Sequence, residues 1–156
     1  MTTTAPAREI AAVEAIVAEA ERLQYDADGY AALLTEDAAI VNFVGRRVAG
    51  REKIRTVMRQ ALASSLADVH TRHELVDVSF PAPGVALANC VKHISDERDV
   101  AAGDDELGSD RGNLTFALVK HDGRWLIALA QTTPIPFEDI PDPEPSPDDA
   151  RDLKST

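Results

Sequence analysis

The spacing of the apolar residues changes once along the chain, and this change constrains the fold more than any other feature. Apolar residues recur at helical spacing from Ala7 to Leu23 and again from Gly50 to Leu66. Four later segments are strand-like instead, namely residues 71–80, 85–94, 113–121 and 124–132. Helices that precede a run of antiparallel strands are typical of the α+β class. The sequence therefore predicts a curved antiparallel sheet with helices on one face.

Turn signals predict how the strands pair. Pro81-Ala82-Pro83-Gly84 separates the first two long strands, and Asp122-Gly123, a strong type I′ signal, separates the last two. A strand over residues 38–44 with a short partner over 46–49 precedes the Gly50 helix. Asp26 is positioned to cap a short second helix that reaches Leu34. The predicted order is helix, helix, hairpin, helix and two long hairpins.

Length and charge exclude several classes of partner. A chain of 156 residues suits one domain with a core and an internal pocket. The net charge of −11 disfavours nucleic acids and anionic membranes, because both would repel the protein. The single Cys90 excludes an intrachain disulfide, and with four scattered His it gives no zinc spacing. No signal peptide or membrane span is recognisable, so we expect a cytoplasmic protein without a metal or cofactor.

Two polar segments are expected to lie outside the core. Residues 96–111 hold seven acids and two glycines, which predicts a solvated loop, either a plain connection or a mobile lid. From Pro134 onward there are six prolines and seven acids against two bases. We therefore predict a domain over residues 1–135 and an acidic, Pro-rich tail over 136–156, whose role stays open.

Hairpin pairing predicts which side chains share a face of the sheet. With Asp122-Gly123 at the turn, His121 pairs with Arg124, and a mainly apolar inner face follows. That face comprises Trp125, Ile127, Leu129, Gln131, Leu114, Phe116 and Leu118. In the first long hairpin Phe80 pairs with Val85, and the inner face comprises Val76, Val78, Leu87, Asn89, Val91 and, nearer an open end, Arg72, Glu74 and His93. The opposite face comprises His73, Leu75, Asp77, Cys90 and Lys92.

The few polar groups on these predicted inner faces are the candidate site residues. Asn89, Gln131 and Asn42 are amides, and an amide buried without a partner costs about 1–3 kcal/mol, so each must bond to neighbours, to water or to a ligand. Their convergence favours a pocket. Glu74 and His93 are candidates for acid or base catalysis, or are rim residues in water. The aromatic candidates either line the predicted pocket or lie in the packing between the helices and the sheet; they are Tyr25, Tyr30, Phe116 and Trp125.

Several segments resemble the NTF2-like superfamily, in particular its SnoaL-like branch. Residues 31–38, 41–45 and 50–52 resemble the opening of that fold. The segments HELVDV at 73–78, GVAL at 84–87, DGRW at 122–125 and QTTP at 131–134 are similar to bacterial proteins called SgcJ/EcaC-like. Some of those proteins accompany enediyne polyketide biosynthesis. The resemblance covers about residues 8 to 135 and implies a cone-shaped fold with a hydrophobic cavity, usually a homodimer formed through the sheet.

The resemblance also implies cofactor-free handling of polyketide-like or steroid-like molecules. Related isomerases and cyclases use an inward carboxylate as base and fixed hydrogen-bond donors for the developing enolate. Glu74 is the candidate for the first role, and Asn89, Gln131 or a tyrosine for the second. Gln131 matches the family's Gln/His-Asn-Thr ending with Thr132 in place of Asn, and Asn89 stands where relatives often carry His or Lys.

Three functions remain open at the level of the sequence. The first is an enzyme that isomerises, cyclises or dehydrates a polyketide-like ketone, with Glu74 or His93 as base. The second is a protein that binds a small apolar ligand without converting it. The third is a protein-interaction module that uses the acidic loop and tail. A Gly-x-Ser-x-Gly nucleophile motif does not occur.

Overall fold

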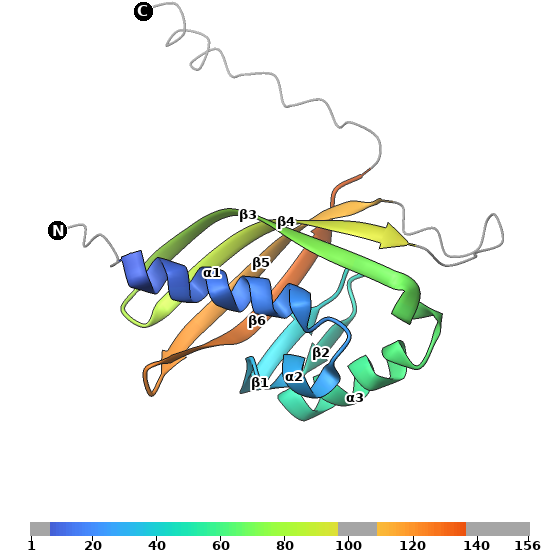
Figure 1. Cartoon of the computed structure of the whole chain (residues 1–156), viewed down its shortest axis with the longest axis horizontal. Helices are drawn as coiled ribbons and strands as arrows, with labels where there is room; N and C mark the ends of the chain where they lie inside the picture. The colour runs from blue at the N-terminus through green and yellow to red at the C-terminus, as the bar shows by residue number, and fades with distance from the viewer. Residues whose placement is uncertain (1–6, 97–108, 137–156) are drawn as a thin grey trace, which may run out of the picture.

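The computed structural model describes residues 7–96 and 109–136, in which helices pack on one curved sheet (Figure 1). The helical elements are α1 (Ala7–Arg22), α2 (Ala27–Ala31), α3 (Arg51–Leu62) and the 3-10 helix η1 (Ser65–Asp68). The strands are β1 (Leu34–Val41), β2 (Arg47–Ala49), β3 (Val69–Ala82), β4 (Val85–Asp96), β5 (Arg111–His121) and β6 (Arg124–Pro134). The predicted α+β class is confirmed.

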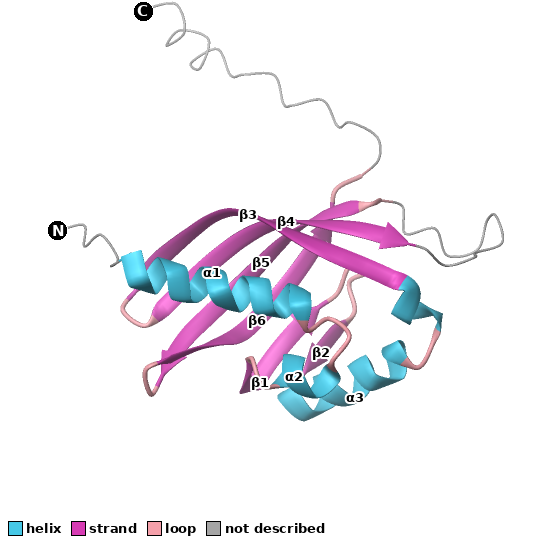
Figure 2. Cartoon of the chain, viewed as in Figure 1, coloured by secondary structure: helices cyan, strands magenta, loops and turns pink. Residues whose placement is uncertain are grey.

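The six strands form a single sheet in the order β2-β1-β6-β5-β4-β3. Neighbouring strands are antiparallel except β1 and β6, which run parallel. Figure 2 shows α1 lying across one face of the sheet, with α2 and α3 gathered at the β1 and β2 end. The helices thus cover one face of the sheet.

Local signals are confirmed at one turn and one helix cap, and the length of one helix is corrected. Asp122 and Gly123 have φ of 50° and 78°, as a type I′ turn requires. The Asp26 carboxylate accepts a hydrogen bond from the Gly29 amide at 2.9 Å, which caps α2. The prediction that this helix reaches Leu34 is wrong. Leu34 is fully buried and already pairs with Ile127 in the parallel ladder, so tertiary pairing with β6 overrides helix propensity.

Helix α1 packs directly on the small side chains of β4. Its buried residues are Val13, Val17 and Ala20, and the same cluster contains Ala86, Ala88 and Cys90. Small residues let a helix backbone approach a sheet closely, so the side of β4 with the smaller side chains faces the helix. Cys90 is only 2% exposed, and the prediction that it faces away from the interior is wrong.

The inner face of the β3 and β4 hairpin is therefore the reverse of the predicted one over most of its length. The predicted pairs of Glu74 with Val91 and of Arg72 with His93 do form. These pairs point away from the helices, whereas His73 and its partner Lys92 line the interior. An irregularity between Leu75 and Asp77 leaves Val76 61% exposed. A further irregularity brings Ala82 opposite Val85, in place of the predicted Phe80.

A β-bulge in β6 changes which of its residues point inward. Leu118 pairs with Ile127, but the neighbouring Ala117 pairs with Leu129, so Ala128 is an extra residue. Alternation restarts after the bulge, and Ala130 and Thr132 are buried instead of Leu129 and Gln131. Gln131 is exposed, so its predicted inward orientation is wrong.

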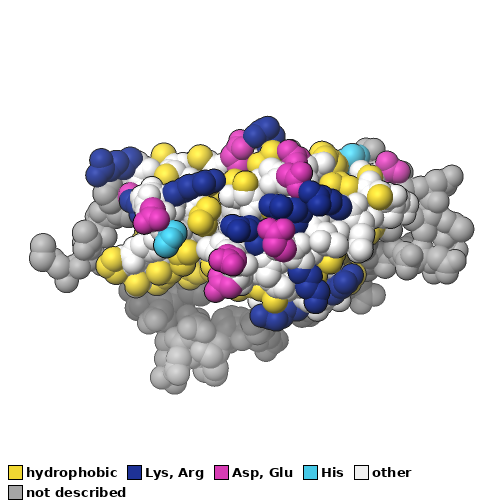
Figure 3. All heavy atoms as spheres, turned by 90° about the horizontal axis from the view of Figure 1, so that it is seen from below, with side chains coloured by type: hydrophobic (Ala, Val, Ile, Leu, Met, Phe, Trp, Pro, Cys, Tyr) yellow, Lys and Arg dark blue, Asp and Glu magenta, His cyan; other side chains and the backbone are white. Residues whose placement is uncertain are grey.

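Ion pairs join α2 to α3. Arg55 and Arg59 of α3 both pair with Asp28 of α2. Figure 3 shows basic and acidic side chains interspersed across the face of the molecule that is seen from below.

Within residues 7–96 and 109–136, no helix has the length and apolarity needed to cross a membrane. The predicted lid, for all but its ends, and the acidic tail beyond residue 136 lie outside the described residues.

Candidate functional site

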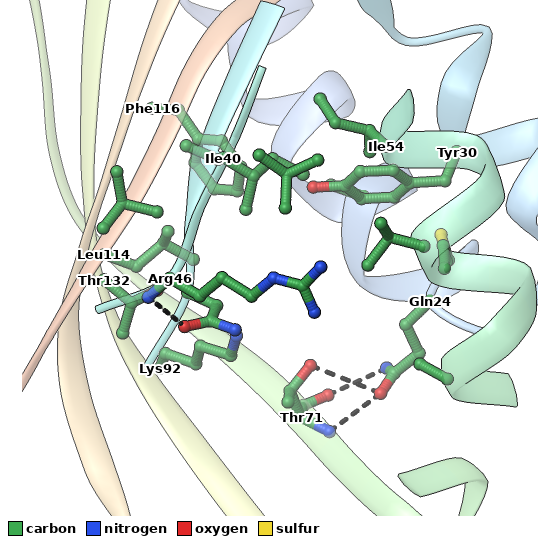
Figure 4. Close-up of a pocket in the computed structure, with 18 of the residues that line it drawn as sticks. Gln24, Tyr30, Ile40, Arg46, Ile54, Thr71, Lys92, Leu114, Phe116 and Thr132 are labelled. Carbon is green, nitrogen blue, oxygen red and sulfur yellow. Dashed lines mark hydrogen bonds between the residues drawn. The ribbon is translucent and has the colours of Figure 1, made fainter. Parts of the chain in front are cut away.

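A cavity of about 280 Å³ lies between the inner face of the sheet and the three helices (Figure 4). Its apolar lining residues are Ala20, Ile40, Val41, Val48, Ile54, Val57, Met58, Ala61, Val69, Leu114, Phe116 and Ala130. Its polar lining residues are Gln24, Tyr30, Asn42, Arg46, Thr71, His73, Lys92 and Thr132. An apolar wall with a few converging polar groups is the usual composition of a small-molecule site.

The apolar wall follows from two amphipathic elements that face each other. One face of α3 contributes Ile54, Val57 and Met58, which the helical spacing of the sequence predicts. The opposite side is Leu114 and Phe116 of β5, both buried and both predicted to face inward. Two apolar surfaces therefore form much of the cavity wall.

Tyr30 of α2 points its hydroxyl group into the cavity (Figure 4). The hydroxyl has no hydrogen-bond partner among the described residues. Burial raises the pKa of Tyr30 to about 12, so the group remains a protonated donor at neutral pH. A ligand oxygen in the cavity could accept this hydrogen bond.

His73 of β3 is held in one orientation at the cavity wall. Its Nδ1 lies 3.3 Å from the Val17 carbonyl oxygen of α1, and its backbone amide donates to the Glu21 carboxylate at 2.6 Å. The carbonyl accepts only, so Nδ1 carries the proton and Nε2 is left with a lone pair. The His73 ring packs edge-on against Phe116. Burial lowers the pKa of His73 and outweighs the hydrogen bond to the Val17 carbonyl, which raises it, so the net shift favours a neutral ring.

Lys92 of β4 stands directly opposite His73 on the neighbouring strand. Such cross-strand neighbours have Cβ atoms about 4.5–5.5 Å apart. The Lys92 amine makes no hydrogen bond or ion pair with any described residue, although it lines the cavity. Burial lowers the pKa of Lys92, because the apolar surroundings disfavour the charged form. The amine is thus available to a ligand.

Polar groups at one side of the cavity are partly committed to structure. The Gln24 amide donates to the Thr71 carbonyl at 2.9 Å and accepts from the Thr71 amide at 2.8 Å, which joins the end of α1 to β3. Asn42 lines the cavity as predicted, and its side-chain oxygen accepts from the amides of Val44 and Arg46. The exposed Arg46 side chain extends across this side (Figure 4). Asn42 therefore shapes the turn that positions Arg46.

The predicted acid–base pair lies on the other face of the sheet. His93 Nε2 and the Glu74 carboxylate are 2.7 Å apart, and both residues are paired away from the cavity. The bond to His93 lowers the pKa of Glu74, whereas a catalytic base requires a raised one. No Asp or Glu is among the described residues that line the cavity. The prediction that Glu74 and His93 lie on the inner face of the sheet is wrong.

The remaining predicted ligand-binding residues divide between the cavity and other places. Asn89 donates to Asp77 at 2.7 Å and accepts from Thr115 at 3.0 Å, on the outer face. Trp125 is 5% exposed and packs against Phe80, and its indole nitrogen donates to the Glu9 carboxylate at 2.8 Å. It therefore belongs to the core beside the first turn of α1. Tyr25 bonds to His70 and borders a separate open hollow. Of the predicted candidates, Asn42, Phe116 and Tyr30 line the cavity.

Sequence reasoning missed His73, Lys92 and Thr132 as cavity residues. One signal was present: strand β4 alternates small and large side chains, and its small residues precede Lys92 on the same face.

A cysteine thiol does not add to the site, because Cys90 is packed in the core and burial raises its pKa to about 11. Among the described residues, no cluster of His, Cys, Asp or Glu has the arrangement of a metal site.

The sequence profile of the SnoaL-like domain matches residues 10–135. The chain therefore belongs to the SnoaL-like family of the NTF2-like superfamily. No curated protein matches the sequence at a significant level.

Solved structures show the same fold. A protein of unknown function from Mycobacterium tuberculosis, Rv3472, is 27% identical with a TM-score of 0.62, over 82% of this chain and 72% of its own. A predicted scytalone dehydratase from Novosphingobium aromaticivorans is 15% identical with a TM-score of 0.67, over 82% and 85%. A ketosteroid isomerase-like protein from Erwinia carotovora is 18% identical with a TM-score of 0.62, over 83% and 98%. The last two identities are low, so these likenesses establish the fold alone.

Proposed function

We propose that the protein binds a small, largely apolar carbonyl compound in the cavity and transfers a proton on it without a cofactor. The observation that carries this proposal is the cross-strand pair of His73 and Lys92 in a mainly apolar wall. Nε2 of a neutral His73 would remove a proton next to the carbonyl. Lys92 and the Tyr30 hydroxyl would stabilise the negative charge that develops on the carbonyl oxygen.

The substrate class rests on cavity size and on resemblance. A cavity of about 280 Å³ is at the lower end of ligand pockets, which span about 300–1,000 Å³. This favours a compact ring system over a long polyene. Two structural neighbours are named as a scytalone dehydratase and a ketosteroid isomerase-like protein. For this chain we propose a compact ring compound that bears a carbonyl group. A polyketide-like ketone fits this description, and the enediyne association remains a prediction within it.

A homodimer formed through the outer face of the sheet is part of the same proposal. Val76 is 61% exposed on that face, and Leu87 and Val91 beside it are only half-buried. A second copy would cover these apolar side chains. Light scattering of Val76→Glu against the unchanged chain tests this, and a monomer in both samples would contradict it.

The binding proposal is tested by filling the cavity. Ala61 of α3 lines the cavity, whereas the adjacent Gln60 is exposed. We expect the unchanged protein and Gln60→Phe to bind β-tetralone and to accelerate deuterium exchange at its α-carbons, measured by NMR in D₂O. Ala61→Phe should do neither. Saturable binding without acceleration would leave a binding protein and refute the catalytic step, and absence of binding would refute the proposal.

A further inference from the structure

The cavity holds one amine in unusual surroundings. Lys92 Nζ has no counter-charge among the described residues, because none of those lining the cavity is an acid. An ammonium group in an apolar site without a partner is costly, so such a lysine either binds an anion or loses its proton. A neutral amine is a nucleophile toward carbonyl carbon.

The other three lysines differ from Lys92 in their surroundings. Lys53 is exposed on α3, and Lys120 pairs with Glu9 at 2.7 Å. Lys154 lies outside the described residues. Burial lowers the pKa of Lys92, which enriches the reactive neutral form there. Lys53 and Lys120 are therefore surface controls for the reactivity of the Lys92 amine.

Imine chemistry needs a group that moves protons next to the amine. His73 occupies the directly opposed cross-strand position and keeps Nε2 free of partners among the described residues, while Nδ1 faces the Val17 carbonyl. The Tyr30 hydroxyl, also without such a partner, can donate to the carbonyl oxygen. Amine, base and donor thus share one small, mainly apolar cavity.

We propose that Lys92 condenses with the carbonyl group of an aldehyde or ketone ligand to form an imine. The Lys92 nitrogen bonds to the carbonyl carbon, the carbonyl oxygen leaves as water, and the nitrogen loses two protons to that water overall. Protonation of the imine gives an iminium ion that accepts electrons when His73 removes a neighbouring proton. This inference rests on the proposed function and assigns Lys92 a covalent part in it; hydrolysis returns the amine and the carbonyl product.

The inference is tested by reductive trapping on the full chain. Naphthaldehyde and β-tetralone are each incubated with the protein and sodium cyanoborohydride, which reduces an iminium to a stable amine, and peptide mass spectrometry locates the adduct. We expect Lys92 to be modified about tenfold or more faster than Lys53 or Lys120, because each unit by which an amine pKa falls gives tenfold more neutral amine. Lys92→Met should abolish this fast adduct.

Two further variants separate a covalent role from an electrostatic one. Lys92→Arg keeps the positive charge but lacks a nucleophilic amine, so it should bind the probes without trapping. Ala61→Phe should prevent both binding and fast trapping. Equal modification of all lysines, or binding of β-tetralone without any adduct at Lys92, would overturn the imine and leave the proposed function standing. Absence of both binding and adduct would overturn the two together.

Discussion

Two neighbouring sites on the β3 and β4 hairpin contain a histidine beside a charged residue, and the sheet separates them. On the helix-covered face, His73 opposes Lys92 in the cavity wall. On the outer face, His93 bonds to Glu74 at 2.7 Å, with the carboxylate largely in water. The sequences of the two sites look equally suited to acid–base chemistry, but only the first adjoins a cavity.

The difference between the two sites follows from solvation. Water and His93 both stabilise the Glu74 carboxylate, so the pKa of Glu74 is lowered and its proton affinity is weak. In the cavity the protein removes part of the water around both groups, and no acidic side chain among the described residues lines it. Burial lowers the pKa of Lys92 and of His73, which raises the fraction of each side chain that is neutral. The outer pair is a hydrogen bond at the surface, whereas the inner pair lines a cavity that a ligand can enter.

The largest expected effect comes from removing the cavity imidazole. His73→Asn retains a donor near the position of Nδ1 for the Val17 carbonyl but lacks Nε2. If Nε2 is the base, α-proton exchange of bound β-tetralone should fall about 10²- to 10⁴-fold. NMR exchange rates at saturating ketone measure this.

His93→Asn is the matched control for that substitution, because it makes the same change on the outer face. It should leave the exchange rate nearly unchanged. Equal losses in the two variants would contradict the assignment of the cavity as the site.

The two faces should also differ in their contribution to stability. Phe116 is 1% exposed and packs against His73, so Phe116→Ala should lower the free energy of unfolding by about 3–5 kcal/mol. Val76→Ala, at an exposed position of β3, should change it by less than about 0.5 kcal/mol in the monomer. Urea unfolding followed by circular dichroism provides both values. Because the proposed dimer would cover Val76, both values are compared at a protein concentration at which only the monomer is present. A large loss at Val76 there would contradict the difference between the faces.

Lys92→Met should stabilise the protein while it removes function. The substitution replaces a buried amine without a partner by an apolar side chain of similar length, and we expect a gain of about 1–3 kcal/mol. Lys53→Met, at an exposed position, is the control and should have little effect. Thermal unfolding measures the gain, and a loss of stability in Lys92→Met would show that the amine has a structural partner.

The same substitution has a definite pH dependence. The pKa of Lys92 is lower in the folded chain than in the unfolded chain, so the unfolded chain binds more protons between the two pKa values. The stability contributed at this position therefore rises with pH in that window. The advantage of Lys92→Met should shrink as pH increases toward the unfolded pKa, near 10.5. A constant advantage would contradict the burial of a titrating amine.

The smallest effect is expected at the outer pair. The pKa of Glu74 is lowered in the folded chain by its bond to His93, so its contribution to stability is present above the unfolded pKa and is lost as pH falls through the folded pKa. Glu74→Gln should be slightly less stable than the unchanged chain at pH 6 and equal to it well below the reference value of 4.5. Unfolding curves at the two pH values test this, with exposed Glu36→Gln as control.

The sequence by itself determined the class of fold and several local structures. The change from helical to alternating spacing predicted helices before a sheet, because each period reflects how one element buries a single face. Asp122-Gly123 predicted its turn, since both positions need positive φ, and Asp26 predicted its helix cap. Phe116 was predicted to face inward and does so. These features depend on interactions between residues close in sequence or across one tight turn.

Only the tertiary structure decided which face of the sheet became the interior. Pairing predicts which side chains share a face, but both faces of β4 are largely apolar, and the close packing of α1 selected the one with Ala86, Ala88 and Cys90. The bulge at Ala128 then reversed the remaining residues of β6, placing Thr132 inside and Gln131 outside. His73 and Lys92 reached the cavity by the same selection, because a one-residue change of facing exchanges every side chain between core and solvent.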